Sequence, residues 1–454
     1  MKIVVKKGLD IPIAGRPEGA LQNLPYQPSH VALNLAPFDE VRFRVHVKVG
    51  DRVLIGQPLV ESKSVPGQMF VSPAAGFVSE IRRGYKRRLL DIVIQVNEQE
   101  TYEEYGSRDP KKATREELLD LFMRSGIFPH IRLRPFNLIP DPKLTPRAIF
   151  VTAIESRPFA PSYEIQVEGK EAYFQAGLDS LRRLTTGAVH LIYRDQSPLR
   201  IFSGADNVEK HVAAGPHPIG NSSVHIHKIA PIRSPDDYVW SLNALDVLTI
   251  GKMVIEGRYL TERVITIAGN GVLPDRRGFF KARMGYPIKD LMENRIPNQL
   301  VRLISGDPLT GTKVEPVDFV GFADCCLSVI PENYEREPFH FFKLGASKFS
   351  ATRTYLTGHI KPPKEGYFFT TNQHGEERAF IDAAVYDRVM PMKIPTMFLI
   401  KAILAEDFET AQHLGLLEVV PEDFALSTFI DPSKIDMMDI VKTGLSRYAK
   451  EMGH

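Results

Sequence analysis

The chain has 454 residues, with 57 lysines and arginines against 55 aspartates and glutamates and a formal net charge of +2. This length exceeds what one hydrophobic core can organise and predicts about three domains. The balanced charge excludes the strongly basic surface typical of nucleic-acid-binding proteins. No apolar run approaches the ~18 residues that span a bilayer, and residues 1–10 lack the apolar core of a signal peptide. The only two cysteines, Cys325 and Cys326, are adjacent and could pair only with strain, so we predict a soluble protein of the reducing cytoplasm.

Two phrases near the N-terminus, residues 47–59 and 72–78, alternate apolar residues around small turn-forming residues. We predict turns at Gly50–Asp51 and Ala75–Gly76, each joining half-buried strands. Together the phrases resemble the flattened sandwich of lipoyl and biotinyl carrier domains, and we assign residues 1–100 to it. Lys63 lies where such carriers hold a modified lysine. Because Pro66 would distort the strand leaving that hairpin, we interpret Lys63 as a solvated lysine, with a carrier lysine as the alternative.

Residues 101–146 read as a linker that contains one short helix over residues 114–123. Thr114 is the expected N-cap, and Glu117, three residues later, completes a capping box. The proline-rich stretch 126–146 predicts irregular structure.

An α/β pattern fills residues 147–257. Strand, helix and strand in succession predict a right-handed parallel unit, a Rossmann-like domain. The elements expected are strands at 148–153, 188–193 and 224–229, a helix at 172–184 and a helical turn at 208–212.

A third unit is expected over residues 258–335, followed by a connector and a helical region over residues 336–454. The clean alternation of residues 263–269 predicts a strand that ends at a glycine, and residues 287–292 begin a helix. The helices expected near the C-terminus cover residues 396–404, 405–414 and 436–450.

Three segments carry a resemblance to a known family: KKGLDIPIAG at 6–15, GPHPIG at 215–220 and RVMP at 388–391. The chain resembles the A subunit (NqrA) of the Na⁺-translocating NADH:quinone reductase nearly from end to end. The resemblance implies an α+β multidomain fold: a barrel-sandwich hybrid (lipoyl-like) domain, a Rossmann-like α/β domain, a β-grasp domain of the SLBB type and a C-terminal helical domain. The C subunit of Rnf complexes and the NADH-oxidising flavoprotein of complex I share this plan.

The resemblance also implies a function. It implies a peripheral subunit, on the cytoplasmic side of the bacterial inner membrane, of a complex that couples quinone reduction by NADH to Na⁺ export. The implied partners are the membrane subunits, chiefly the large B subunit that bears quinone and flavin, and the isolated chain should not be catalytic. Two alternatives stay open: an electron-transfer protein like the Rnf C subunit, and a binding module for a small soluble ligand.

Several groups needed to hold redox cofactors are missing from the sequence. The complex I relative cradles FMN with a glycine-rich loop, but no Gly-x-Gly-x-x-Gly motif occurs here, and Arg157 stands where that relative has an acidic residue. An iron–sulfur cluster needs four thiolates, and residues 424–434, where relatives place such cysteines, contain none. We therefore expect no redox cofactor in this chain and assign NADH, FAD, FMN and iron–sulfur centres to partner subunits.

A quinone is the one ligand that the resemblance assigns to this subunit. It associates two segments with quinone binding, residues 33–41 and 134–136. A quinone site needs an apolar slot and one or two donors for the carbonyl oxygens. The candidate residues are Phe38, His46, Arg134 and Phe136.

Histidines and basic residues form two further patterns. His225 and His227 would share one side of the strand expected at 224–229, but no familiar metal spacing completes the set, so we predict a polar network and no metal site. The basic residues are interpreted as solvated surface, with acidic lipid head groups or partner loops as the alternative. The histidines are His211, His217, His225 and His227; the basic residues are Arg82, Arg83, Lys86, Arg87 and Arg88, with a second patch at Arg132 and Arg134.

Overall fold

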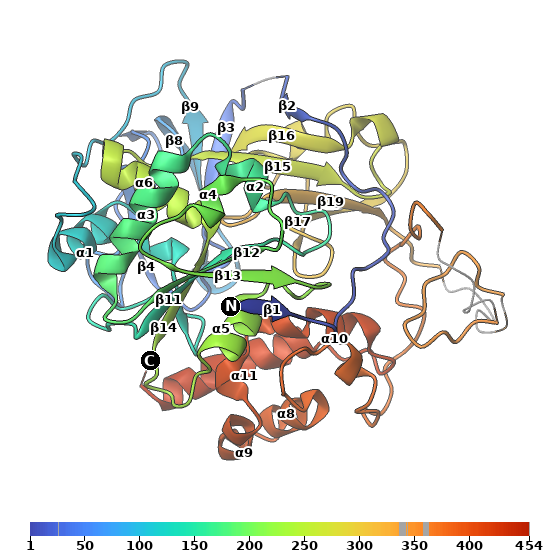
Figure 1. Ribbon diagram of the computed structural model, residues 1–454. Coiled ribbons are helices and arrows are strands. Elements are labelled where there is room, and N and C mark those ends of the chain that lie inside the picture. The colour runs from blue at the N-terminus through green and yellow to red at the C-terminus, as the bar shows by residue number, and fades with distance from the viewer. Residues whose placement is uncertain (26, 336–341, 343, 357–362, 454) are drawn as a thin grey trace.

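The computed structural model describes every residue except 26, 336–341, 343, 357–362 and 454. Parts of the connector predicted over residues 336–454 therefore lie outside the described residues. Within the described part, the strands form two six-stranded sheets, one four-stranded sheet and one three-stranded sheet. Figure 1 shows the sheets side by side, with the C-terminal helices beneath them.

Two small sheets near the N-terminus form the expected sandwich. Side chains of both sheets, among them Val31, Leu33 and Phe70, are buried between them. Gly50 forms the predicted turn, because its φ of +94° suits glycine and the carboxylate of Asp51 accepts from Lys48 N at 2.9 Å. One sheet contains β3 (His30–Asn34), β9 (Leu89–Val96), β8 (Gly76–Arg83) and β5 (Arg52–Val53), and the other β4 (Phe43–Val45), β6 (Pro58–Ser62) and β7 (Met69–Val71).

The turn predicted at Ala75–Gly76 is wrong, because Gly76 begins strand β8. A Cβ atom on Gly76 would lie 1.8 Å from the carbonyl oxygen of Gln95 on β9. Glycine is needed here because the two strands approach closely, not because the chain turns.

The linker helix α1 (Arg115–Arg124) begins as predicted. Thr114 accepts from the Glu117 amide at 3.2 Å, and the Glu117 carboxylate accepts from the Thr114 amide at 2.8 Å. After it, β10 (Arg132–Arg134) adds an antiparallel strand to the central sheet. The stretch 126–146 is otherwise irregular, as the prolines predict.

In the central sheet, the strand order reverses next to β11 (Ala148–Ala153). From β11 the chain moves one way, to β12 (Val189–Arg194) and β13 (Glu209–Ala214), and then returns to β14 (Val239–Asn243) on the other side of β11. β1 (Lys2–Val4) continues the parallel set beside β13. In such sheets ligands bind where the strand order reverses, at the carboxyl ends of the strands. Here that crevice lies between β11 and β14.

Two predicted elements of this domain are wrong. Of the predicted helical turn at 208–212, residues 209–212 belong to strand β13, because β12 and β1 pair with it on both sides. Residues 224–229 belong to helix α5 (Ser222–Ile229), not to a strand. A short, largely apolar stretch fits both periods, and here burial against the sheet and the C-terminal helices decides in favour of the helix.

Helices cover both faces of the central sheet (Figure 1). One face carries α2 (Tyr163–Val167), α3 (Glu171–Leu184) and α6 (Ala244–Glu256), of which only α3 was predicted. On the other face α5 contacts the C-terminal helices, which share its hydrophobic cluster. The C-terminal helices are α8 (Thr396–Leu404), α9 (Phe408–His413), α10 (Ala425–Ile430) and α11 (Met437–Glu451), three of which the sequence predicts.

The remaining sheet belongs to the β-grasp domain. Its central strand β15 (Glu262–Ala268) and the helix α7 (Ile288–Met292) are those predicted. The N-terminal segment supplies its edge strand β2 (Leu21–Asn23), so residues 1–25 contribute to two sheets. The other strands are β16 (Gly278–Arg283), β17 (Val301–Ser305), β18 (Thr312–Val314) and β19 (Cys326–Pro331).

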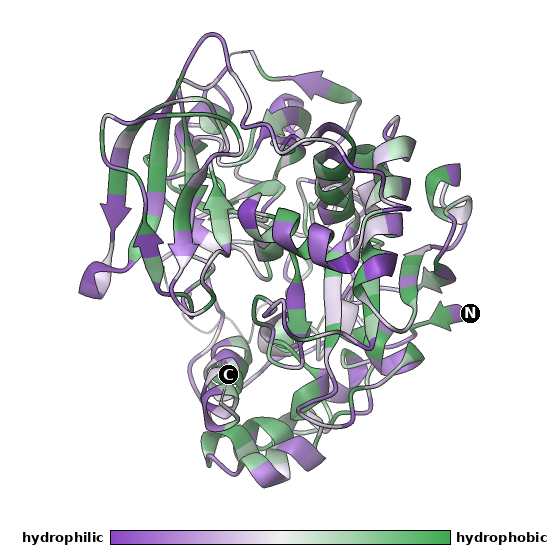
Figure 2. Cartoon of the chain, turned by 90° about the vertical axis from the view of Figure 1, so that its left-hand side faces the viewer, coloured by the Kyte–Doolittle hydropathy of each residue, from purple (hydrophilic) through white to green (hydrophobic). Residues whose placement is uncertain are grey.

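Among the described residues, none of the helices combines the length and the apolar character needed to cross a bilayer. Figure 2 shows hydrophilic residues interrupting the helices, including those near the C-terminus.

Candidate functional site

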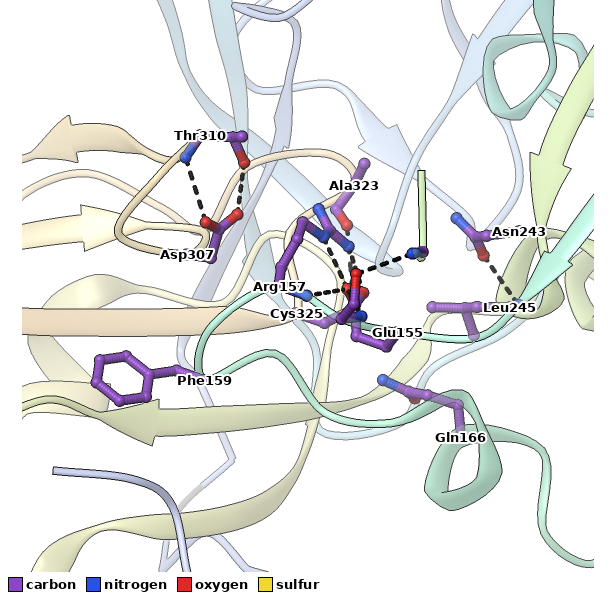
Figure 3. A network of polar contacts seen from close by, with 12 residues as sticks. Glu155, Arg157, Phe159, Gln166, Asn243, Leu245, Asp307, Thr310, Ala323 and Cys325 are labelled. Atoms are coloured by element: carbon purple, nitrogen blue, oxygen red, sulfur yellow. Dashed lines mark hydrogen bonds and ion pairs between the residues drawn. The ribbon is translucent and has the colours of Figure 1, made fainter. Parts of the chain in front are cut away.

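The crevice at the carboxyl ends of β11 and β14 is the first place to look for a ligand. Glu155 and Arg157 follow β11, and Asn243 ends β14 and caps α6 by accepting from Leu245 N at 2.9 Å. The β-grasp domain closes the opposite side with Asp307 and Cys325 (Figure 3). The crevice is therefore a junction between two domains.

An ion pair between Glu155 and Arg157 occupies this crevice. One Glu155 oxygen accepts from the Arg157 amide at 2.8 Å and from Arg157 Nε at 3.0 Å, and the other accepts from the guanidinium at 2.6 Å. Burial opposes the charge of Glu155, but attraction to Arg157 and these hydrogen bonds outweigh it and lower the pKa of Glu155. Arg194 donates to the Glu155 carbonyl oxygen at 2.7 Å and fixes the same turn.

The space left in the crevice is small. Its cavity volume is about 30 Å³, whereas ligand pockets have roughly 300–1,000 Å³. The cavity accommodates water but not an isoalloxazine ring or a nucleotide.

The adjacent cysteines lie at the edge of this crevice as free thiols. Burial raises the pKa of Cys325 to about 11 and that of Cys326 to about 12. Both thiols are therefore protonated at neutral pH, and neither is suited to act as a nucleophile.

Two of the predicted quinone residues, Phe38 and His46, lie in the barrel-sandwich domain. The Phe38 ring packs edge-on against Phe70 at a centroid distance of 4.9 Å, and the Arg132 guanidinium lies 5.0 Å above it. His46 Nε2 pairs with the Glu61 carboxylate at 3.1 Å.

The other two, Arg134 and Phe136, lie against the C-terminal helices. Arg134 is 1% exposed and donates to Ser223 Oγ and to the Glu418 carbonyl oxygen, both at 3.0 Å. Phe38 and Phe136 belong to different hydrophobic clusters, so the four residues do not line one slot. The prediction of a basic surface patch at Arg132 and Arg134 is wrong, because the Arg134 side chain is buried in the interior.

The four histidines do not gather at one place. His217 Nδ1 pairs with Ser156 Oγ at 2.9 Å, and His225 Nε2 pairs with the Ile219 carbonyl oxygen at 2.7 Å. His227 pairs with Glu418 at 2.6 Å, on a different side of α5 from His225. Within the described part of the chain, a hydrogen bond to another histidine joins His211, of these four, to His190.

A second, larger cavity lies between the β-grasp domain, the connector and the C-terminal helices. Its volume is about 1,040 Å³, and aromatic rings line it. Phe349 lies 5.7 Å from Phe429 in a stacked arrangement, and Phe369 lies 5.9 Å from Phe429. No sequence pattern marks this cavity, because its walls come from segments hundreds of residues apart and aromatic residues in a connector carry no periodic signal.

Comparison with known proteins settles the family. The models of the NqrA N-terminal barrel-sandwich hybrid domain, the NqrA second alpha/beta domain and the NQRA C-terminal domain match residues 3–97, 113–259 and 264–315. The A subunit of the Na⁺-translocating NADH-quinone reductase of Chlamydia caviae is 40% identical over 100% of this chain and 98% of its own length. The chain belongs to the NqrA family. The same subunit of Chlamydia muridarum is 39% identical, and that of Tolumonas auensis is 36% identical, each over 99% of this chain.

The NqrA domain models coincide with the segments built around the crevice. The second alpha/beta model covers Glu155, Arg157 and Asn243, and the C-terminal model covers Asp307.

Among solved structures, a chain of the NAD⁺-reducing [NiFe]-hydrogenase in the air-oxidised state aligns over 75% of this chain and 67% of its own length, with 13% identity and a TM-score of 0.39. The NqrA assignment rests on the sequence relatives alone.

Proposed function

We propose that this chain is the cytoplasmic, peripheral A subunit of a sodium-pumping NADH:quinone oxidoreductase. It docks on the membrane subunits of the complex, chiefly the large B subunit, and holds no redox cofactor of its own. The full-length match to subunits of that name carries the proposal. Flavins, iron–sulfur centres and the NADH site belong to the partner subunits.

The closed crevice supports the absence of a flavin. Glu155 and Arg157 fill the place where a parallel sheet of this topology receives a ligand, and about 30 Å³ is left. The chain has two cysteines, fewer than the four thiolates that an iron–sulfur cluster needs, which supports the absence of such a cluster. The domain then serves as a rigid docking body.

For a quinone, the aromatic cavity is a better candidate than the four residues inferred from the resemblance. Its volume suits a ring with part of an isoprenoid tail, and its walls combine Phe429 and Phe349 with polar groups from Thr428 and Lys434. Phe38 and Arg134 are almost fully buried in packed clusters, so a quinone could reach them only after those clusters open.

Labelling with a photoreactive quinone analogue tests this assignment in the purified complex. We expect Phe429→Ala to reduce labelling of this chain several-fold, since the variant removes one wall of the slot. The matched control is Phe398→Ala, which removes an exposed ring on α8. Labelling that is unchanged by Phe429→Ala but lost in Phe38→Ala would contradict this assignment. It would instead support a quinone site near Phe38, one of the four residues inferred from the resemblance.

Co-purification tests the assignment to the complex. A tagged copy of this chain is expected to recover the membrane subunits from detergent-solubilised membranes. Recovery of the tagged chain alone from the soluble fraction, with a bound water-soluble ligand, would instead favour the small-ligand module. A lipoyl or biotinyl mass increment on Lys63, which is exposed after β6, would favour the carrier alternative.

A further inference from the structure

Three side chains with metal-ligating atoms converge on one face of the central sheet, away from the crevice. In the parallel pairing of β12 and β13, His190 lies opposite Glu209 and Ile192 lies opposite His211. Residues two apart on a strand point to the same face, so Glu209 and His211 share the face of His190. His190 Nδ1 lies 3.1 Å from His211 Nε2 and 3.2 Å from the Glu209 carboxylate. The three ligand atoms all lie within 4.8 Å of one another.

Hydrogen bonding alone does not satisfy this cluster. If His190 Nδ1 carries a proton, it has two competing acceptors, His211 Nε2 and Glu209, and the proton of the neutral His211 ring sits on Nδ1, which is buried and has no partner among the described residues. If His211 Nε2 carries the proton, the lone pair of His190 Nδ1 faces the Glu209 carboxylate. In either tautomer one favourable contact is missing, and a buried polar atom without its partner is costly.

We propose that His190, Glu209 and His211 bind one zinc ion. Two imidazole nitrogens and one carboxylate oxygen form a donor set suited to zinc, and a fourth position stays open for water. A cation between the three atoms accepts all three lone pairs at once, so the lone pair of His190 Nδ1 no longer faces the Glu209 carboxylate without a positive charge between them. His211 then ligates through Nε2 and keeps its proton on Nδ1.

The two histidines are held in the interior, while the carboxylate reaches the surface. His190 and His211 are each 6% exposed, so bulk water competes little for their ring nitrogens. Arg147 is a positive charge near His190. Its guanidinium is paired with Asp237 and donates to the Ala230 and Pro231 carbonyl oxygens. The Glu209 side chain is 62% exposed and gives the ion a path from solvent.

The site was invisible in the sequence, because His190 and His211 lie 21 residues apart and belong to no familiar spacing. Strand pairing alone brings them together. The site is independent of the proposed function, since it lies on strands β12 and β13 and not in the crevice or the aromatic cavity.

Calorimetric titration of the chelator-treated full chain with zinc tests the proposal. We expect one high-affinity zinc ion per chain, and a cobalt-substituted sample should show the visible absorption bands of a four-coordinate ion. Glu209→Gln removes a ligand from an exposed position without disturbing the interior and should weaken binding at least about tenfold. His211→Asn should weaken it by at least as much.

Glu80→Gln is the matched control, because it removes an exposed strand glutamate in a different domain. It is expected to bind zinc like the unmodified chain. Absence of a stoichiometric ion in the unmodified chain, or unchanged affinity in either Glu209→Gln or His211→Asn, would overturn the proposal. Circular dichroism of each variant shows whether a loss of binding reflects a loss of fold.

Discussion

At the scale of single residues, Glu155 and Arg157 determine the chemistry of the crevice. The carboxylate is buried, and its hydrogen-bond acceptors are occupied by Arg157 and by the amide of Ser156. Removing one member of a buried ion pair leaves the other charge uncompensated. The ion pair therefore fills the crevice, and replacing either member alone should destabilise the protein.

Arg157→Ala is expected to lower the free energy of unfolding by about 3 kcal/mol, at the low end of the range for buried pairs, because the Arg157 side chain is 36% exposed. Urea denaturation followed by circular dichroism measures this change. The double variant Glu155→Gln/Arg157→Met removes both charges and should recover most of the loss. A single variant as stable as the unmodified chain would show that the ion pair does not stabilise the fold.

Glu422 makes stability depend on pH. Burial, reinforced by the neighbouring Asp423, raises the pKa of Glu422 to about 7 from an ordinary value of 4.5. A carboxyl whose pKa is higher in the folded state contributes stability that is present below the unfolded pKa and is lost as pH rises through the folded pKa. Glu422→Gln should match the unmodified chain near pH 4 and exceed its stability by about 1–3 kcal/mol near pH 8.5.

The pH profile of thermal or urea unfolding checks this expectation. Glu409→Gln, which changes an exposed glutamate on α9, is the control and should leave the profile unaltered. A stability difference for Glu422→Gln that is constant between pH 4 and pH 8.5 would contradict the assignment.

Some of these residue-scale features could be read from the sequence and others could not. The lack of a phosphate-binding loop and the arginine at position 157 are visible directly. The separation of Phe38 from Phe136, by contrast, depends on which cluster each ring joins, and no local pattern encodes that. The same limit hid the aromatic cavity.

At the scale of elements, the contact between α3 and α6 depends on two glycines. A Cβ atom on Gly177 would lie 2.2 Å from the Val247 carbonyl oxygen, and one on Gly251 would lie 1.7 Å from the Tyr173 carbonyl oxygen. Glycine in a helix interior is intrinsically unfavourable. Here the absence of Cβ atoms lets the two helix backbones touch across the face of the sheet.

Gly251→Ala should therefore destabilise the protein, although alanine is the better helix former. The helices must move apart, and overpacking of this kind costs about 1–3 kcal/mol. Glu171→Ala, at the exposed start of α3, is the control and is expected to stay within about 0.5 kcal/mol of the unmodified chain. A Gly251→Ala chain that is more stable than the unmodified one in urea denaturation would contradict the close packing.

Elements with local signals were predicted well, and elements defined by their neighbours were not. The capping box of Thr114 and Glu117 located α1 to within one residue at each end. The strand β13 and the helix α5 were exchanged, because sheet pairing and burial override the short-range pattern. Helix α6 was overlooked, although Asn243 with Asp246 forms a capping box and Gly257 ends the helix in the left-handed region.

At the scale of the whole molecule, the N-terminal segment ties two domains together. It supplies β1 to the central sheet and β2 to the β-grasp sheet. Arg283 of β16 donates to the Glu100 carboxylate at 2.6 Å and joins the β-grasp domain to the end of the barrel-sandwich domain. A division of the sequence into consecutive domains could not anticipate these exchanges, because strand pairing between distant segments is set by the assembled fold.

The cofactor content of this chain tests the central claim most directly. The chain is released from the purified membrane complex, and flavin fluorescence and iron are measured per polypeptide. Far less than one flavin and one iron atom per chain is the predicted result, with both recovered in the remaining subunits. One tightly held flavin or iron–sulfur cluster per chain would contradict the account, because it would require a crevice that Glu155 and Arg157 do not close.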